Sequence, residues 1–157
     1  MTEDVTRPKA SEVGCSVCTQ KESHILVLSE HALVSVSPQG VRPGHLLVAS
    51  RRHVESFAEL NDAEVYGLMR VLAETVIVAE RVMRAERYHI LRIGDKAPHL
   101  HFHLIPRMTG DEKLGPFVFG ERGWAGSVAR PISDQDLEAF IRSFKATTAR
   151  NHAFEHD

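Results

Sequence analysis

Three histidines alternate with apolar residues in the segment His99-Leu100-His101-Phe102-His103. Successive side chains of a β-strand point to opposite faces, so a strand here would put the three imidazoles on one face and the apolar side chains in the core. Same-face neighbours would then lie roughly 6.5–7 Å apart, near enough to share a ligand or to orient one another. Pro106 follows soon after and is expected to end the strand.

Two chemistries fit such a row of imidazoles. Neutral imidazole is a good zinc ligand, so two or three of these histidines could hold a catalytic metal ion. Alternatively, the central residue, His101, could attack phosphorus while its neighbours orient the ring and bind phosphate oxygens. A lone histidine on a strand is most often structural, but three in register favour a functional site.

A pair of cysteines near the start of the chain, Cys15 and Cys18, is a second candidate group. The two-residue gap lets both thiolates face one tetrahedral zinc ion. Redox pairs and unpaired thiols share this spacing, and a disulfide is the other alternative. The spacing alone therefore leaves the role of the pair open.

The length and composition of the chain limit the kinds of protein that could position these groups. It has 157 residues, with 19 Lys and Arg against 21 Asp and Glu, a net charge of −2. That length fits one domain with a sizeable core, and the charge balance excludes an overall attraction to nucleic acid or anionic membranes. No apolar run reaches the roughly 18 residues of a membrane span, and two cysteines make no disulfide framework, so a cytoplasmic location is expected.

Local composition predicts the domain boundaries, and hydrophobic periodicity predicts the secondary-structure elements. We expect residues 1–12 to form a flexible arm, residues 13–148 a single domain and residues 149–157 a flexible tail. The glycine-rich and aromatic segment 108–130 is expected to pack locally. Apolar and β-branched runs predict strands over residues 24–29, 32–36, 46–49, 88–93 and 100–105.

Two helices are predicted. The first covers Asp62–Arg84, since Asn61 is a good N-cap and Glu64 completes a capping box. The second starts at Ser133, with Asp136 at its third position. Hairpin strands with one long helix and a C-terminal helix predict an α+β fold, in which the helices pack on a face of an antiparallel sheet.

The pattern His-x-His-x-His followed by two apolar residues resembles the signature of the histidine triad (HIT) superfamily of nucleotide hydrolases and transferases. The resemblance extends from about Cys15 to Arg107. Pro43-Gly44-His45-Leu46-Leu47-Val48 looks like the family's lead into a strand, and Arg51-Arg52-His53-Val54 like its lead into the long helix. The turn Gly94-Asp95-Lys96-Ala97-Pro98 resembles the bacterial branch that is described as diadenosine-polyphosphate hydrolase-like.

The resemblance implies roles for three histidines. His101 would attack the α-phosphorus of a nucleotide and carry a nucleotidyl intermediate, which water then cleaves. His103 would orient that ring or hold a phosphate oxygen, and His45 would contact the phosphate or the leaving group. The implied partner is a nucleotide or dinucleoside polyphosphate substrate, and the family's usual homodimer is expected.

Other functions remain open. A nucleoside phosphoramidate or a phosphorolytic transfer would use the same first step. The chain could instead be a non-catalytic nucleotide-binding module, or a metal-dependent hydrolase with all three triad histidines as ligands.

The resemblance also implies a metal site. Several HIT relatives close a zinc site with the histidine of the Arg-x-His segment and the first triad histidine, which match His53 and His99 here. Together with Cys15 and Cys18 they would hold a structural Zn²⁺ with no open position.

The chain departs from the family pattern in two places. Many members have Ser, Thr or Gln just before the triad, where this chain has Lys96, Ala97 and Pro98. Lys96 could supply a cation to a polyphosphate. Many members also have an acidic residue that binds the ribose, and Ser35 or Ser37 occupies that region here.

Overall fold

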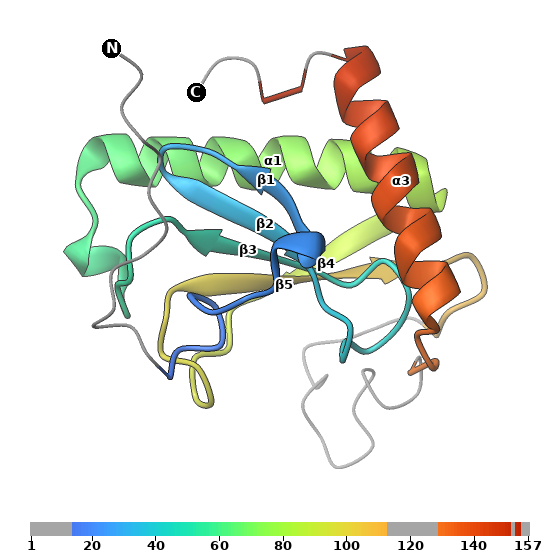
Figure 1. Cartoon of the computed structure of the whole chain (residues 1–157), viewed down its shortest axis with the longest axis horizontal. Helices are drawn as coiled ribbons and strands as arrows, with labels where there is room; N and C mark the ends of the chain where they lie inside the picture. The colour runs from blue at the N-terminus through green and yellow to red at the C-terminus, as the bar shows by residue number, and fades with distance from the viewer. Residues whose placement is uncertain (1–13, 113–128, 152, 155–157) are drawn as a thin grey trace.

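Five strands form one antiparallel sheet in the spatial order β1-β2-β3-β5-β4. The structure is a computed structural model and describes residues 14–112, 129–151 and 153–154 (Figure 1). The strands are β1 (Ile25–Leu28), β2 (Ala32–Val36), β3 (Leu46–Ser50), β4 (Arg87–Leu91) and β5 (His101–Arg107). The helices are α1 (Asp62–Met83) and α3 (Asp134–Asn151), with short 3-10 turns η2 (Glu22–His24) and η3 (Phe57–Glu59).

The predicted α+β architecture is therefore confirmed. The expected arm and residues 113–128 of the segment 108–130 lie outside the described residues. Within the described part of the chain, no helix is both long enough and apolar enough to cross a membrane.

Helix α1 begins as predicted and covers one face of the sheet (Figure 1). The Asn61 side chain accepts from the Glu64 backbone N–H, and the Glu64 side chain accepts from the Asn61 backbone N–H. The helix ends where Arg84 adopts the left-handed conformation, with φ of 51°. Its buried apolar residues join the core between helix and sheet and include Leu68, Val71, Leu72, Val78 and Ala79.

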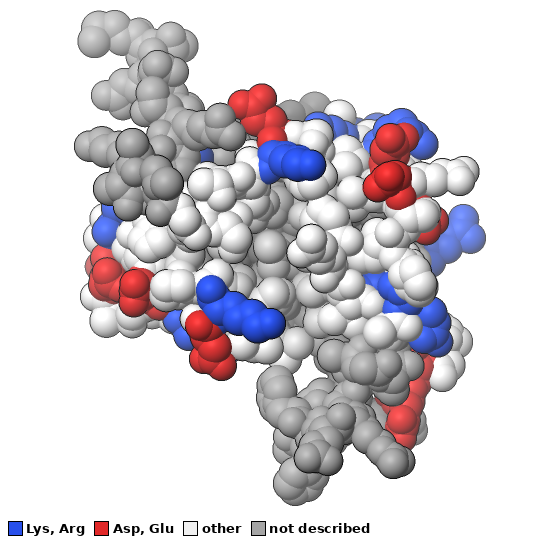
Figure 2. Space-filling model, turned by 60° about the horizontal axis from the view of Figure 1, so that its bottom comes forward, with Lys and Arg blue, Asp and Glu red and all other residues white. Residues whose placement is uncertain are grey.

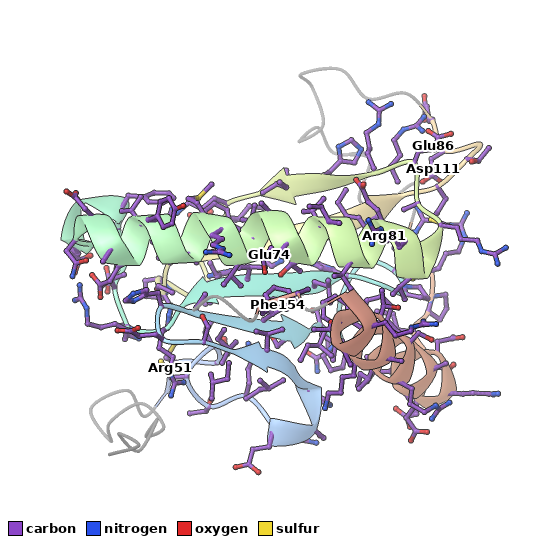
Figure 3. All side chains as sticks on the ribbon, turned by 90° about the horizontal axis from the view of Figure 1, so that it is seen from above. Arg51, Glu74, Arg81, Glu86, Asp111 and Phe154 are labelled. Atoms are coloured by element: carbon purple, nitrogen blue, oxygen red, sulfur yellow. The ribbon has the colours of Figure 1, made fainter. Side chains whose placement is uncertain are left out.

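Helix α3 packs on α1 and extends further than the sequence predicts. Its start is capped by Ser133, whose hydroxyl accepts from the Asp136 N–H. The helix continues past residue 149, where a flexible tail is expected, to Asn151. The chain then returns to α1, where the Phe154 N–H donates to Glu74 at 2.8 Å and the Phe154 side chain packs on the core (Figure 3). These contacts hold residues 153–154 against α1.

Strand β5 also differs from its prediction, because Pro106 does not end it. Pro106 is fully buried and pairs with Tyr88 of β4, and the strand continues to Arg107. Its carbonyl points away from β4, toward the Arg42 side chain. In a strand, N and O of one residue point the same way. The missing N–H therefore faces the side where β3 has already ended, at the Leu46–Leu104 pair, and no ladder hydrogen bond is lost.

The alternation along β5 separates the core from the candidate site. Phe102 pairs with Val48, and both lie in the core with the residues of α1. His101 and His103 point to the opposite face, where His103 pairs with Leu47. Sheet and helix together thus provide a rigid support for two of the three triad histidines on the face that α1 does not cover.

Candidate active site and metal centre

His45, His103 and His101 form a hydrogen-bonded series, which we call the imidazole row. His45 Nε2 lies 3.0 Å from His103 Nδ1, and His103 Nε2 lies 3.2 Å from His101 Nε2. The row ends on two backbone groups. The Val41 N–H donates to His45 Nδ1 at 2.9 Å, and His101 Nδ1 lies 2.6 Å from the His99 carbonyl oxygen.

These end groups determine which nitrogen of each neutral ring carries the proton. A backbone N–H can only donate, so His45 Nδ1 accepts and its proton is on Nε2. A carbonyl can only accept, so the proton of His101 is on Nδ1 and its Nε2 has a free lone pair. His103 then accepts from His45 at Nδ1 and donates from Nε2 to His101. Every hydrogen bond in the row is satisfied with all three rings neutral.

Electrostatics favour the neutral forms of His45 and His103. Burial and, to a smaller extent, the neighbouring His103 lower the pKa of His45 from 6.5 to about 4. Burial and then His101 lower the pKa of His103 from 6.5 to about 4 in the same way. Desolvation penalises the charged ring, so both side chains are uncharged at neutral pH.

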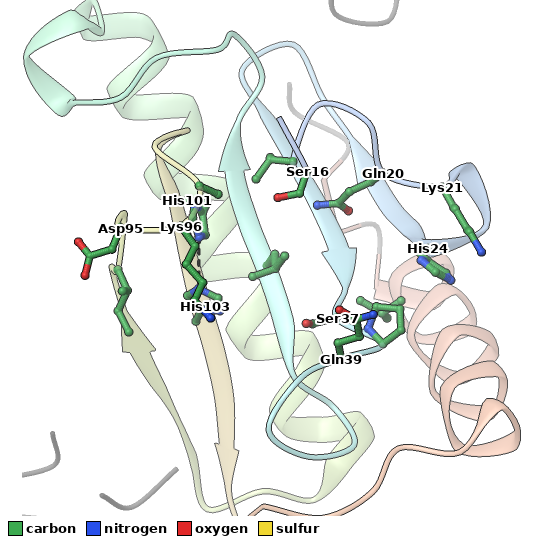
Figure 4. Close-up of a pocket in the computed structure, with 16 residues that line it drawn as sticks. Ser16, Gln20, Lys21, His24, Ser37, Gln39, Asp95, Lys96, His101 and His103 are labelled. Atoms are coloured by element: carbon green, nitrogen blue, oxygen red, sulfur yellow. Dashed lines mark hydrogen bonds between the residues drawn. The ribbon is translucent and has the colours of Figure 1, made fainter. Parts of the chain in front are cut away.

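The row borders a cleft of about 700 Å³. Strand β5 contributes His101 and His103, and the turn before it contributes Asp95 and Lys96 (Figure 4). The loop after β2 contributes Ser37. On this face of the molecule, charged side chains lie mainly toward the rim and the centre is largely uncharged (Figure 2).

The structure separates the predicted substrate residues into two groups. His101, His103, Lys96 and Ser37 all line the cleft, whereas His45 is buried and is not among the residues that line it. Ser35 is fully buried in β2, and its hydroxyl has no hydrogen-bond partner among the described residues. Of the two serines considered at the ribose position, only Ser37 is among the residues that line the cleft.

One wall of the cleft comes from a segment for which the sequence predicts no such place. The stretch that follows the first cysteine folds over this face of the sheet (Figure 4). Its cleft-lining residues are Ser16, Val17, Gln20, Lys21 and His24. The available signal was their position beside the Cys-x-x-Cys pair, since a metal that joins Cys15 and Cys18 to later histidines necessarily brings the segment to the triad.

Cys15, Cys18, His53 and His99 form a compact group, which we call the Cys2His2 cluster. Their four ligand atoms lie within 4.8 Å of one another. Cys18 Sγ is 3.3 Å from Nδ1 of both histidines, and Cys15 Sγ is 3.6 Å from His99 Nδ1. A tetrahedral zinc ion would separate S and N ligands by about 3.6 Å, so the donor set and its spacing fit that ion.

His99 belongs to the cluster by its side chain and to the imidazole row by its backbone. Its Nε2 lies 2.8 Å from the Ser50 carbonyl, so the proton is on Nε2 and the lone pair of Nδ1 faces the thiols. Its own carbonyl accepts from His101. His99 precedes β5 rather than lying in it, because the neighbouring Leu100 N–H bonds to Val54 O instead of continuing the ladder.

This arrangement argues against a metal ion held by all three triad histidines. Among the residues that the structure describes, one group of three or more potential ligands comes together. It contains His99 but neither His101 nor His103, whose ring nitrogens bond to each other.

Comparisons with known proteins agree with this geometry. A family model described as the HIT domain matches residues 18–110. An uncharacterized HIT-like protein from Methanocaldococcus jannaschii is 31% identical over 121 residues, which cover 74% of this chain and 84% of that protein. A zinc-bound histidine triad family protein from Mycobacterium smegmatis has the same fold, with a TM-score of 0.66 and 20% identity over 90% of this chain and 97% of that one.

Two relatives have names that state an activity. AP-4-A phosphorylase from Mycobacterium tuberculosis is 30% identical over 98 residues, or 59% of this chain and 49% of the relative. The asymmetrical bis(5'-nucleosyl)-tetraphosphatase from Schizosaccharomyces pombe is 30% identical over 95 residues, or 57% of this chain and 51% of the relative. The chain thus matches about half the length of each. With the family model covering more than half of the chain, these matches show that the protein belongs to the HIT domain family.

Proposed function

We propose that this protein cleaves a phosphoanhydride bond of a dinucleoside polyphosphate through a nucleotidyl intermediate on His101. The observation that carries the proposal is the direction of the imidazole row, which leaves the Nε2 lone pair of His101 unprotonated at the cleft. The names of the phosphorylase and tetraphosphatase relatives support this class of substrate. Lys96 and Ser37 are proposed to contact the substrate because they line the same cleft.

The proposed reaction has two steps. His101 Nε2 forms a bond to the α-phosphorus while the bridging P–O bond breaks, and the electron pair leaves on the polyphosphate oxygen. Positive charge that develops on the ring is stabilised by the His99 carbonyl, which accepts from Nδ1–H. His103 Nε2–H, released from His101, donates to a phosphate oxygen. Water then replaces His101 at phosphorus, yielding a mononucleotide and a proton.

Phosphorolysis is the second candidate, because the phosphorylase relative is named for it. Inorganic phosphate would then take the place of water in the second step and yield a nucleoside diphosphate. Product identity with and without added phosphate distinguishes the two reactions.

The nucleophile can be tested by trapping the intermediate. A dinucleoside polyphosphate labelled at the α-phosphate should label the wild-type protein, and the adduct should survive base but not acid because a P–N bond is acid-labile. His101→Asn should carry no label and should lose at least about 1,000-fold in turnover. His31→Asn, a matched change outside the site, should label normally. Labelling or undiminished turnover of His101→Asn would refute the assignment.

The neutral state of the row predicts how stability depends on pH. Between the ordinary pKa of 6.5 and the native pKa of about 4, His45 takes up a proton in the unfolded state but not in the folded one. Unfolding is therefore favoured as the pH falls through this window. His45→Asn, which cannot titrate, should flatten the dependence by up to about 1.4 kcal/mol per pH unit. Urea unfolding at several pH values measures this; parallel curves for the two proteins would contradict it.

We also propose that the Cys2His2 cluster holds Zn²⁺. Four protein ligands would complete a tetrahedral shell, so the ion would be structural and would leave the reaction to the imidazole row. The donor set, its spacing and the zinc-bound structural relative support this proposal.

Metal analysis tests the zinc proposal. The wild-type protein should contain one zinc per chain, and Cys15→Ser and Cys18→Ser should lose it and unfold at lower temperature, because bound metal stabilises the folded state. His101→Asn should keep the full zinc content. Stoichiometric zinc in both cysteine variants, or its loss in His101→Asn, would show that the ion is held elsewhere.

A homodimer is proposed from the exposed apolar residues of α1 and β4. Tyr66, Met69 and Ile77 lie along the outer side of α1, and Ile90 lies on the edge strand β4, each between 42% and 73% exposed. Ile90 pairs with Leu104, which places it on the same face of the sheet as α1. Such a patch favours a protein interface.

Light scattering can decide the oligomeric state. The wild-type protein should have twice the 17.5 kDa mass of the chain. Ile77→Glu should give the single-chain mass, because a buried charge opposes association. Leu28→Glu, a matched change at a residue that is 43% exposed on the opposite edge strand β1, should remain dimeric. A monomeric wild-type protein, or a dimeric Ile77→Glu variant, would argue against this surface.

A further inference from the structure

The outer end of the imidazole row depends on a loop, residues 37–45, that connects β2 to β3. This loop supplies the Val41 N–H that donates to His45 Nδ1. Gly40 packs directly on the same ring, since a Cβ there would lie 2.5 Å from His45 Nδ1. The position of the loop backbone and the position of the ring are therefore coupled.

One buried ion pair ties this loop to the end of β5. Arg42 Nη1 lies 2.6 Å from Asp111 Oδ2, and the two side chains are only 10% and 11% exposed. The same Arg42 nitrogen lies 3.5 Å from the Pro106 carbonyl. Asp111 is held in turn by the Met108 N–H at 2.7 Å. The strand that carries His101 and His103 thus also holds the loop that carries the donor to His45.

A second ion pair holds the other side of this junction. Arg107 pairs with Glu86 and donates to the Asp111 carbonyl at 2.9 Å. Glu86 and Asp111 lie together near the C-terminal end of α1 (Figure 3). Asp111 is therefore a rigid partner for Arg42, because both its side chain and its backbone are bonded to residues of β5 or its exit.

We propose that Arg42 and Asp111 are positioning residues, whose ion pair holds the Val41 N–H against His45 and so keeps His45 and His103 protonated on Nε2. The catalytic consequence rests on the proposed function. Without a donor at Nδ1, neutral His45 is free to carry its proton there, and its Nε2 becomes an acceptor. His103 would then donate from Nδ1 to His45, and its Nε2 would no longer donate toward His101 or a phosphate oxygen.

Histidine tautomers provide a readout that does not depend on turnover. Long-range proton–nitrogen NMR identifies the protonated nitrogen of each ring. In the wild-type protein at neutral pH, His45 and His103 should be protonated on Nε2 and His101 on Nδ1. Arg42→Met removes the ion pair but keeps apolar length, and it should give mixed tautomers at His45 and His103. Arg42→Lys retains the charge and should restore the wild-type pattern in part.

Activity supplies the second readout. Because small misplacements of catalytic groups are costly, Arg42→Met should lower kcat about 10-fold and change KM less than about twofold. In a His45→Asn background, adding Arg42→Met should change kcat less than about twofold, since the two residues act in one series. Arg70→Met, which removes the Arg70–Glu74 pair on α1, should leave tautomers and kcat as in the wild-type protein.

Three results would overturn the proposal: unchanged tautomers in a folded Arg42→Met protein, losses that multiply in the double variant, or an Arg70→Met protein with the same tautomer change. If Arg42→Met does not fold, Asp111→Asn replaces it, because that change keeps Arg42 and its bond to Pro106. If the wild-type protein turns over no dinucleoside polyphosphate, the proposed function fails, and the tautomers alone then decide the roles of Arg42 and Asp111.

Discussion

A neutral imidazole has one N–H donor and one lone pair, and the candidate site depends on this limit. Three such rings in series can all be satisfied only if the groups at the two ends differ, one a donor and the other an acceptor. The Val41 N–H and the His99 carbonyl meet that condition. Backbone groups cannot change their role with pH, so they give the series a fixed direction that charged side chains could not.

His99 joins two parts of the molecule with separate tasks. Its ring belongs to the Cys2His2 cluster and its carbonyl to the imidazole row. The cluster also lies at the start of the stretch that follows Cys15. That stretch forms one wall of the cleft. A change at the cysteines therefore reaches both a wall of the cleft and the residue whose carbonyl bonds to His101, although neither thiol lies in the row.

Local patterns predicted much of this structure, and long-range contacts explain the rest. The alternation along β5 and the capping box of α1 are visible in the sequence because each depends on neighbouring residues. The Arg42–Asp111 pair joins residues 69 positions apart, and no local pattern indicates it. The family resemblance indicated the roles expected of His45, His53 and His99. It gave no indication that Ser35 would be buried away from the cleft.

The burial of Pro106 has a consequence for assembly of the sheet. Beyond the last β3 pair, no strand of the described residues lies beside this side of β5, and a strand edge without a partner can recruit a strand from another molecule. Pro106 offers no N–H to such a strand, and its carbonyl faces the Arg42 guanidinium. The gap is thus closed by a side chain rather than by a strand, which protects the sheet from aberrant pairing beside the imidazole row.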